Sequence, residues 1–147
     1  MSLALSKQDL AEYLEEVFPQ VHSDFVVEEL TETSITMRLR VEDRHLRPGG
    51  TVSGPSMFGL ADVSVYAMVL ARKGRQSLAV TTNSSLDFLR KPKGGADLIA
   101  ECKLLKLGRT LAVGDVLMYS EGSDKPVARA SMTYSIPPEG SAAAAFG

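Results

Sequence analysis

One carboxylate, Asp62, stands in the middle of an apolar stretch and could act as a catalytic base or nucleophile. Residues 56–72 are small or hydrophobic at nearly every position, which is typical of a helix buried on all sides. Because an unpaired ionised carboxylate is strongly unfavourable there, Asp62 must be hydrogen-bonded, line a cavity, or both. A structural role in capping a neighbouring loop would also fit. Carboxylates on apolar walls are nevertheless functional candidates, and this reading is favoured.

A turn rich in glycine and proline leads into this helix. It contains Pro48, Gly49, Gly50, Gly54 and Pro55. The N–H groups at the start of a helix, together with its dipole, can stabilise negative charge on an oxygen. The turn therefore predicts a donor site at the beginning of the helix that carries Asp62.

The bulk composition excludes several classes of protein. A length of 147 residues predicts one domain, and a net charge of −2 argues against a general nucleic-acid binder. With one cysteine, Cys102, and two histidines, neither an intrachain disulfide nor a Cys/His metal site is expected. No secretory signal is recognisable, and Asp62 interrupts the longest apolar run, so no membrane span is expected. We therefore expect a cytoplasmic protein that binds neither nucleic acid nor membrane.

The periodicity of the chain predicts two helices and six strands. An amphipathic helix is expected at about residues 6–18, with Ser6 as N-cap and an end before Pro19. A hairpin of residues 24–31 and 34–41 precedes the buried helix. Four further strands are expected at residues 78–88, 97–107, 110–119 and 127–136. These elements form one domain over residues 1–137, and residues 138–147 are expected to be a loose tail.

This order of elements predicts an α+β fold in which a curved antiparallel sheet wraps around the long central helix. Consecutive strands joined by tight turns form one sheet, and an apolar helix needs cover on most sides. The remaining apolar flank of the helix is expected to be covered by a second copy of the protein.

The pattern resembles the hot-dog fold and, more narrowly, the acyl-CoA thioesterases of the phenylacetate-degradation type. That family has a His-Gly-Gly turn followed by a helix with Leu-Ala-Asp. Here the sequence GTVSGP (50–55) precedes FGLAD (58–62) at the same spacing. Later landmarks follow in order: TTNSSLDFLRKP (81–92), LGR (107–109) and VARASMTY (127–134).

The resemblance implies roles for the matching positions. Asp62 corresponds to the catalytic carboxylate, acting as general base on water or as nucleophile on the thioester carbonyl. Gly54 corresponds to the residue whose backbone N–H holds the thioester oxygen. Thr81 aligns with a hydroxyl that helps to place the attacking water. Ser53 stands where the family has its histidine and is a candidate polar assistant.

Other positions are candidates for binding the substrate. Pro55 replaces the second glycine and cannot donate a hydrogen bond, while Arg47 stands where some relatives have an Asn that binds the same oxygen. Asn83 lies in the TTNSS motif. Tyr66 follows Asp62 at i+4 and could contact it or the acyl chain. His45 could approach the site, although a surface position is favoured.

The spacing along the helix has a further consequence. Gly54 and Asp62 are eight positions apart, which corresponds to about 12 Å of helix, so one carbonyl cannot contact both within one chain. If both act on one thioester, they come from different subunits. We therefore expect a homodimer, assembled further into a dimer of dimers (a homotetramer).

Basic residues could hold the phosphates of coenzyme A, which here is part of the substrate, so that no separate cofactor is expected. One cluster contains Arg90, Lys91 and Lys93, and a second follows the buried helix at residues 72–75. Solvated surface charge explains either cluster equally well. Two other functions stay open: a non-catalytic protein that binds acyl-CoA or an aromatic ligand and, fitting worse, an enoyl-CoA hydratase or dehydratase.

Overall fold

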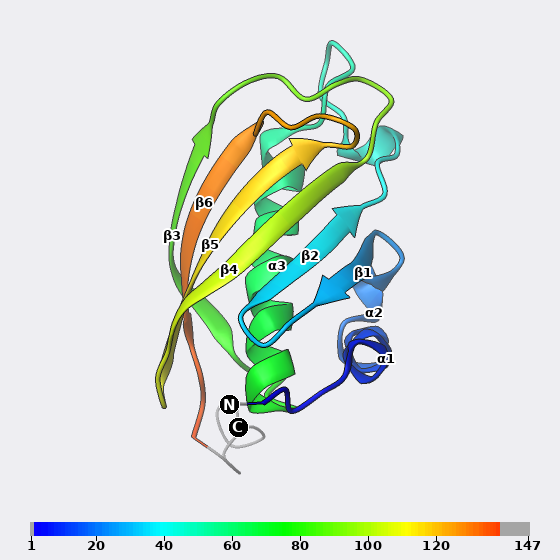
Figure 1. Ribbon diagram of the computed structural model, residues 1–147. Coiled ribbons are helices and arrows are strands. Elements are labelled where there is room, and N and C mark those ends of the chain that lie inside the picture. The colour runs from blue at the N-terminus through cyan, green and yellow to red at the C-terminus, as the bar shows by residue number, and fades with distance from the viewer. Residues whose placement is uncertain (1, 139–147) are drawn as a thin grey trace.

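A six-stranded antiparallel sheet curves around one long helix, α3 (Figure 1). This computed structural model describes residues 2–138. In chain order the elements are α1 (Lys7–Val17), α2 (Pro19–His22), β1 (Phe25–Leu30), β2 (Ser34–Leu39), the 3₁₀ turn η1 (Asp43–His45), α3 (Gly54–Lys73), β3 (Val80–Phe88), β4 (Leu98–Leu107), β5 (Leu111–Ser120) and β6 (Ala128–Ser135). The strand order β1-β2-β4-β5-β6-β3 leaves β1 and β3 at the edges. This is the predicted hot-dog fold. The predicted tail, apart from Pro138, lies outside the described residues.

α3 is the helix predicted around Asp62, and it begins two residues earlier than expected, at Gly54. Its N-cap is Ser53, whose Oγ accepts a hydrogen bond from the Ser56 N–H at 3.3 Å. Pro55 occupies the first turn, where its missing N–H has no intrahelical partner to lose. At the other end Gly74 adopts a φ of 90°, which ends the helix. The local sequence therefore sets both ends of α3.

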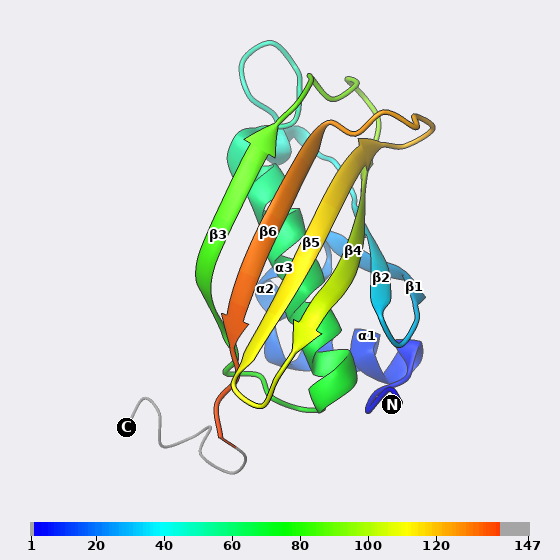
Figure 2. The same cartoon turned by 60° about the vertical axis from the view of Figure 1, so that its left-hand side comes forward.

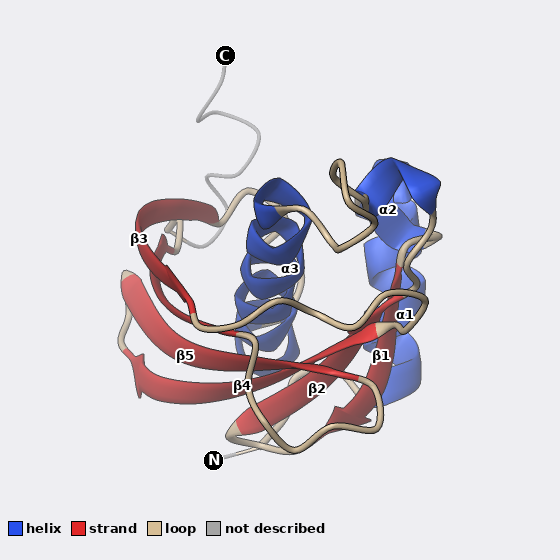
Figure 3. Ribbon diagram, turned by 90° about the horizontal axis from the view of Figure 1, so that it is seen from above, coloured by secondary structure: helices blue, strands red, loops and turns tan. Residues whose placement is uncertain are grey.

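The apolar character of α3 is explained by its position in the core. By length and composition the helix could cross a membrane, but 67% of that stretch is buried inside the protein. Figure 3 shows the sheet curving around one side of α3, with α1 on the side of β1. On the sheet, Gly114 of β5 permits a close approach, because a Cβ there would lie 3.2 Å from a methyl group of Val65. α3 is thus a core helix covered by the protein itself.

β3 pairs with β6 through a register that shifts by one residue. Thr81 pairs with Tyr134 and Asn83 pairs with Thr133, so a bulge between them leaves Thr82 without a partner of its own. The other long edge of β3 pairs with no strand of the described chain (Figure 2). The strand is therefore regularly paired on one side only.

The N-terminal helix follows the prediction closely. Ser6 is the N-cap of α1 and accepts a hydrogen bond from the Asp9 N–H, while Leu10 and Leu14 are buried. Ahead of α1, the N–H of Ala4 donates to the carbonyl of Ala71, which ties the start of the chain to α3. The short helix α2 was not predicted, because a single turn has too few residues to show a helical period. α1 and α2 together flank β1.

The surface position expected for His45 is wrong. Its side chain is 8% exposed, its Nδ1 accepts a hydrogen bond from the Glu42 N–H at 2.9 Å, and its Nε2 lies 3.4 Å from the Asp24 carboxylate. Its carbonyl accepts from the Ser53 N–H at 2.8 Å. His45 therefore connects the end of the first hairpin to the residue that caps α3.

We expect His45→Leu to lower the free energy of unfolding by about 0.5–1.5 kcal/mol, because it removes the hydrogen bond that the Glu42 N–H donates to the imidazole. Urea unfolding followed by circular dichroism measures this change. His22→Leu is the matched control, since His22 is exposed. Equal stability of the two variants would contradict a bracing role for His45.

Candidate active site

A groove of about 460 Å³ exposes Asp62 beside the middle of α3. We call it the Asp62 groove. It is bounded by α3, by the end of α1, by the segment that leads into β3 and by β6, and its lining residues are Val17, Phe18, Gln20, Asp62, Val63, Tyr66, Ser77, Ala79, Val80, Thr81 and Tyr134. A carboxylate in a groove lined by both polar and apolar side chains can therefore meet a ligand from outside.

Two hydroxyl groups hold one oxygen of the Asp62 carboxylate. Thr81 Oγ1 donates to Asp62 Oδ1 at 2.5 Å, and the Tyr134 hydroxyl donates to the same oxygen at 2.8 Å. The Tyr134 hydroxyl also lies 3.1 Å from the Asp62 carbonyl oxygen. Within the described residues the second oxygen, Oδ2, accepts no hydrogen bond. The carboxylate is thus fixed through one oxygen and has the other available for a reacting molecule.

Tyr134 is the site residue that the sequence reasoning missed. Burial, and next the negative charge of Asp62, raise the pKa of Tyr134 above the ordinary value of a tyrosine. Its hydroxyl therefore stays protonated and remains a donor to Asp62 through neutral and mildly alkaline pH. One available signal was its place as the only hydroxyl-bearing aromatic among the inward positions of β6, which include Ala128, Ala130 and Met132.

Tyr66 lines the same groove, but its hydroxyl does not reach Asp62. It donates to the Ser77 carbonyl at 2.8 Å, and burial raises its pKa to about 12. Its ring lies between those of Phe18 and Tyr134, with a centroid separation of 6.1 Å to each. Tyr66 therefore contributes an aromatic surface to the groove, and its polar end is occupied by the backbone.

Gly54 and Ser53 lie away from the Asp62 groove, at the N-terminal end of α3. The N–H of Gly54, as the first residue of the helix, has no intrahelical acceptor. The ring of Phe88 covers this position, since a Cβ on Gly54 would lie 3.2 Å from its edge. Ser53 Oγ donates to Ser56 Oγ at 2.9 Å, so its hydroxyl serves the cap. The structure keeps the predicted oxygen-binding donor and Asp62 apart within one chain.

The predicted substrate-binding residues Arg47, Asn83, Arg90 and Lys91 are all exposed and lie outside the Asp62 groove. The loops that carry Arg47 and Lys91 meet at the end of the molecule where α3 begins (Figure 1). Arg90 is partly engaged, because its Nε donates to the Pro126 carbonyl at 2.9 Å. Exposed cations thus gather near the predicted oxygen donor, away from Asp62.

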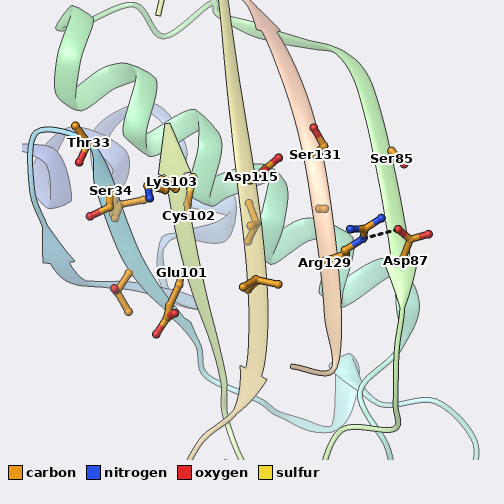
Figure 4. Close-up of a pocket in the computed structure, with 15 residues that line it drawn as sticks. Thr33, Ser34, Ser85, Asp87, Glu101, Cys102, Lys103, Asp115, Arg129 and Ser131 are labelled. Atoms are coloured by element: carbon orange, nitrogen blue, oxygen red, sulfur yellow. Dashed lines mark hydrogen bonds and ion pairs between the residues drawn. The ribbon is translucent and has the colours of Figure 1, made fainter. Parts of the chain in front are cut away.

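Another hollow, of about 650 Å³, lies on the opposite face of the sheet (Figure 4). Its polar side chains include Glu101, Lys103 and Asp115, together with the ion pair of Arg129 and Asp87 at 2.8 Å. These side chains are exposed, and none is a predicted site residue. Its size alone therefore does not make it the reactive site. Among residues 2–138, no group of three or more His, Cys, Asp or Glu side chains could hold a metal ion.

Comparisons with known proteins agree with the fold. The sequence profile of the thioesterase superfamily matches residues 49–127. A Pseudomonas aeruginosa protein named as a candidate esterase is 32% identical over 104 residues, covering 70% of this chain and 75% of that protein. Acyl-coenzyme A thioesterase 13 of Mus musculus is 26% identical over 132 residues, covering 86% and 93%.

Solved structures extend the similarity over nearly the whole chain. The crystal structure of a candidate thioesterase from Silicibacter sp. TM1040 superposes with a TM-score of 0.89 at 66% identity, covering 94% of this chain and 96% of that one. A thioesterase-fold protein of Streptococcus pneumoniae, solved with coenzyme A, has a TM-score of 0.70 at 20% identity and covers 90% and 98%. The chain is a thioester hydrolase that belongs to the thioesterase superfamily.

Proposed function

We propose that this protein is an acyl-CoA thioesterase of the phenylacetate-degradation type, which hydrolyses an acyl-CoA thioester to the free acid and coenzyme A. The observation that carries the proposal is the Asp62 carboxylate, which lines a groove and is held through Oδ1 by Thr81 and Tyr134. Such a group can activate water or attack a thioester carbonyl directly. The coenzyme A bound to the Streptococcus pneumoniae relative supports the substrate class.

The unpaired edge of β3 supports a dimer. β3 is nine residues long. Val80 and Phe88 at its two ends are 47% and 55% exposed, and Leu89 directly after it is 47% exposed. A long edge with exposed apolar side chains is a template for pairing with another chain. In the dimer we propose, a second copy pairs its own β3 against this edge across a two-fold axis.

This pairing would bring the two ends of the site together. Thr81, which contacts Asp62, lies near the start of β3, and Phe88, which covers Gly54, lies at its end. In an antiparallel two-fold pair, the start of one β3 lies beside the end of the other. Asp62 would therefore approach the partner's Gly54, as the spacing along α3 requires.

The chemistry assigned to this composite site has two parts. The thioester carbonyl oxygen accepts a hydrogen bond from the partner's Gly54 N–H, which stabilises the negative charge that develops there. Asp62 either takes a proton from a water that attacks the carbonyl carbon, or attacks that carbon itself to form an anhydride that water then cleaves. In both routes the C–S bond breaks, the thiolate leaves as coenzyme A, and the acid is released.

The proposal extends to the residues that hold coenzyme A, to the oligomer and to the compartment. The exposed cations near the start of α3, Arg47, Arg90 and Lys91, would contact the phosphates of coenzyme A, and no other cofactor takes part. We further propose that two dimers associate into a homotetramer. The cytoplasm is the proposed compartment, because the single thiol, Cys102, is buried and free.

The test is thiol release from a panel of short, medium, long and aryl acyl-CoAs, measured with the full-length protein at known oligomeric state. We expect turnover of at least one class. Binding of acyl-CoA without release of thiol, by folded protein, would favour a non-catalytic ligand-binding role. Addition of water to an enoyl-CoA without thiol release would favour a hydratase.

We expect Tyr134→Phe to lower kcat by about 10- to 150-fold, because a hydrogen bond to a charged group contributes about 1.5–3 kcal/mol and Asp62 would keep only the bond from Thr81. The readout is kcat separated from KM. Tyr66→Phe is the matched control: it loses a hydroxyl from the same groove that bonds Ser77 and leaves Asp62 untouched. Equal kcat in the two variants would contradict a positioning role for Tyr134.

A further inference from the structure

A second cavity lies directly behind the Asp62 groove. It has a volume of about 270 Å³ and lies between α1, α2, β1 and α3. We call it the α1 cavity. Its apolar wall includes Leu14, Phe25 and Val27, and its remaining lining residues include Glu15, His22 and Arg40. Two residues, Phe18 and Val63, line both the groove and the cavity. They form the partition between the two spaces.

Phe18 is the part of this partition that lies outside α3. Val63 is buried on the rigid helix α3, directly after Asp62, whereas Phe18 is half-buried at the junction of α1 and α2. The Phe18 ring meets the Tyr66 ring edge-on, with an interplanar angle of 85°, and the Tyr66 ring in turn neighbours that of Tyr134. The aromatic wall therefore runs from the Asp62 carboxylate to Phe18 without a break.

We infer that Phe18 is a specificity-determining residue, which separates the Asp62 groove from an acyl-chain extension in the α1 cavity. This inference rests on the proposed function, since an acyl group attached to a carbonyl at Asp62 can extend along the aromatic wall. A short acyl chain ends at Phe18, and a longer aliphatic chain must displace the ring to enter the α1 cavity. Together the two spaces have the size of pockets that enclose a drug-sized ligand.

The occupant we assign is an unbranched aliphatic chain. The cavity is apolar where Leu14, Phe25 and Val27 line it, and it is open to solvent where the exposed Glu15, His22 and Arg40 line it. On the side of the Asp62 groove only Phe18 and Val63 separate the two spaces, and an unbranched chain can extend past the Phe18 ring more easily than a bulky ring system. Each methylene transferred from water into such a space increases affinity by about fourfold. The position of the Phe18 ring therefore decides how many methylenes contribute.

The test compares wild type, Phe18→Ala and Phe18→Trp on acyl-CoAs with short, medium and long saturated chains. We expect Phe18→Ala to raise the ratio of long-chain to short-chain kcat/KM by about tenfold, which corresponds to between one and two additional buried methylenes. Phe18→Trp should lower that ratio. Adding Val26→Trp to Phe18→Ala, which places a large ring in the α1 cavity, should return the ratio toward wild type. Leu105→Ala, an exposed truncation on β4, is the control and should leave the profile unchanged.

A second readout separates this inference from the proposed function. S-alkyl-CoA thioethers of the same chain lengths cannot be hydrolysed, so their dissociation constants report the acyl site without catalysis. Absence of thiol release by wild type, with chain-length-dependent thioether binding that shifts in Phe18→Ala, would reject the hydrolase and support the inference. Unchanged chain-length dependence in Phe18→Ala, or an equal loss for all chain lengths, would overturn the inference. Melting temperatures of all variants establish that each is folded.

Discussion

Asp62→Asn is expected to lower kcat for thioester hydrolysis by at least about a hundredfold, within the range of about 10²–10⁴ that general base catalysis contributes. The amide cannot take a proton from water and is a poor nucleophile. Its carbonyl oxygen can still accept the hydrogen bonds from Thr81 and Tyr134, so the groove keeps its shape. The loss would therefore report chemistry and not misfolding. Thiol release under saturating substrate measures it.

A second carboxylate, Asp87, serves as the control for Asp62→Asn. Asp87 is also on the described chain, but it is exposed on the outer face of the sheet and paired with Arg129. Asp87→Asn is expected to retain nearly full activity. If Asp62→Asn kept activity close to that of wild type, the catalytic group would have to lie elsewhere.

Gly54→Pro is expected to lower kcat by about 10²–10³-fold, because it removes the N–H proposed to hold the oxyanion. Proline fits the first position of a helix, so α3 should still begin there. Gly54→Ala is the matched control, since alanine keeps the N–H. Its Cβ would lie 3.2 Å from the edge of Phe88, whose ring is 55% exposed and can shift. Equal activity of the two variants would exclude this donor.

The same substitution tests whether the site spans two subunits. A heterodimer of one Asp62→Asn subunit and one Gly54→Pro subunit, isolated with two different affinity tags, would keep one composite site intact. It should recover about half of the wild-type activity per dimer, although each parent homodimer is nearly inactive. If Asp62 and Gly54 acted within one chain, neither subunit of the heterodimer would be competent. Absence of recovery would therefore reject the dimeric site.

The sequence predicted those parts of the fold that depend on local pattern. Ser6 marks the start of α1, the turn that contains Pro55 precedes α3, and the alternation in the later strands gave their limits to within a few residues. Asp62 was recognisable because a charge in an apolar helix needs a partner. These signals lie within a few residues of the features that they predict.

Contacts between distant segments could not be read in the same way. Tyr134 donates to a carboxylate 72 positions earlier in the chain, and the packing of α3 against β6 brings the two together. His45 was placed at the surface because its partner Asp24 belongs to the preceding hairpin. The grouping of Phe18 with Val63 likewise depends on how α1 packs on the sheet. Each case depends on tertiary packing, which overrides local preference.

The bulge in β3 determines on which face of the sheet the side chains at the two ends of this strand lie. Side chains alternate between the two faces of a regular strand, so Thr81 and Phe88, seven positions apart, would face opposite ways. The unpaired Thr82 shifts this alternation by one position, so the side chains of Thr81 and Phe88 lie on the same face of the sheet. Thr81 can therefore reach Asp62 while Phe88 covers Gly54. The exposed side chains of Asn83 and Asp87 contact neither Asp62 nor Gly54. An insertion or deletion of an odd number of residues between Thr81 and Phe88 would turn the side chain at one end of the strand to the other face of the sheet. This strand can therefore change length during evolution only in steps of two.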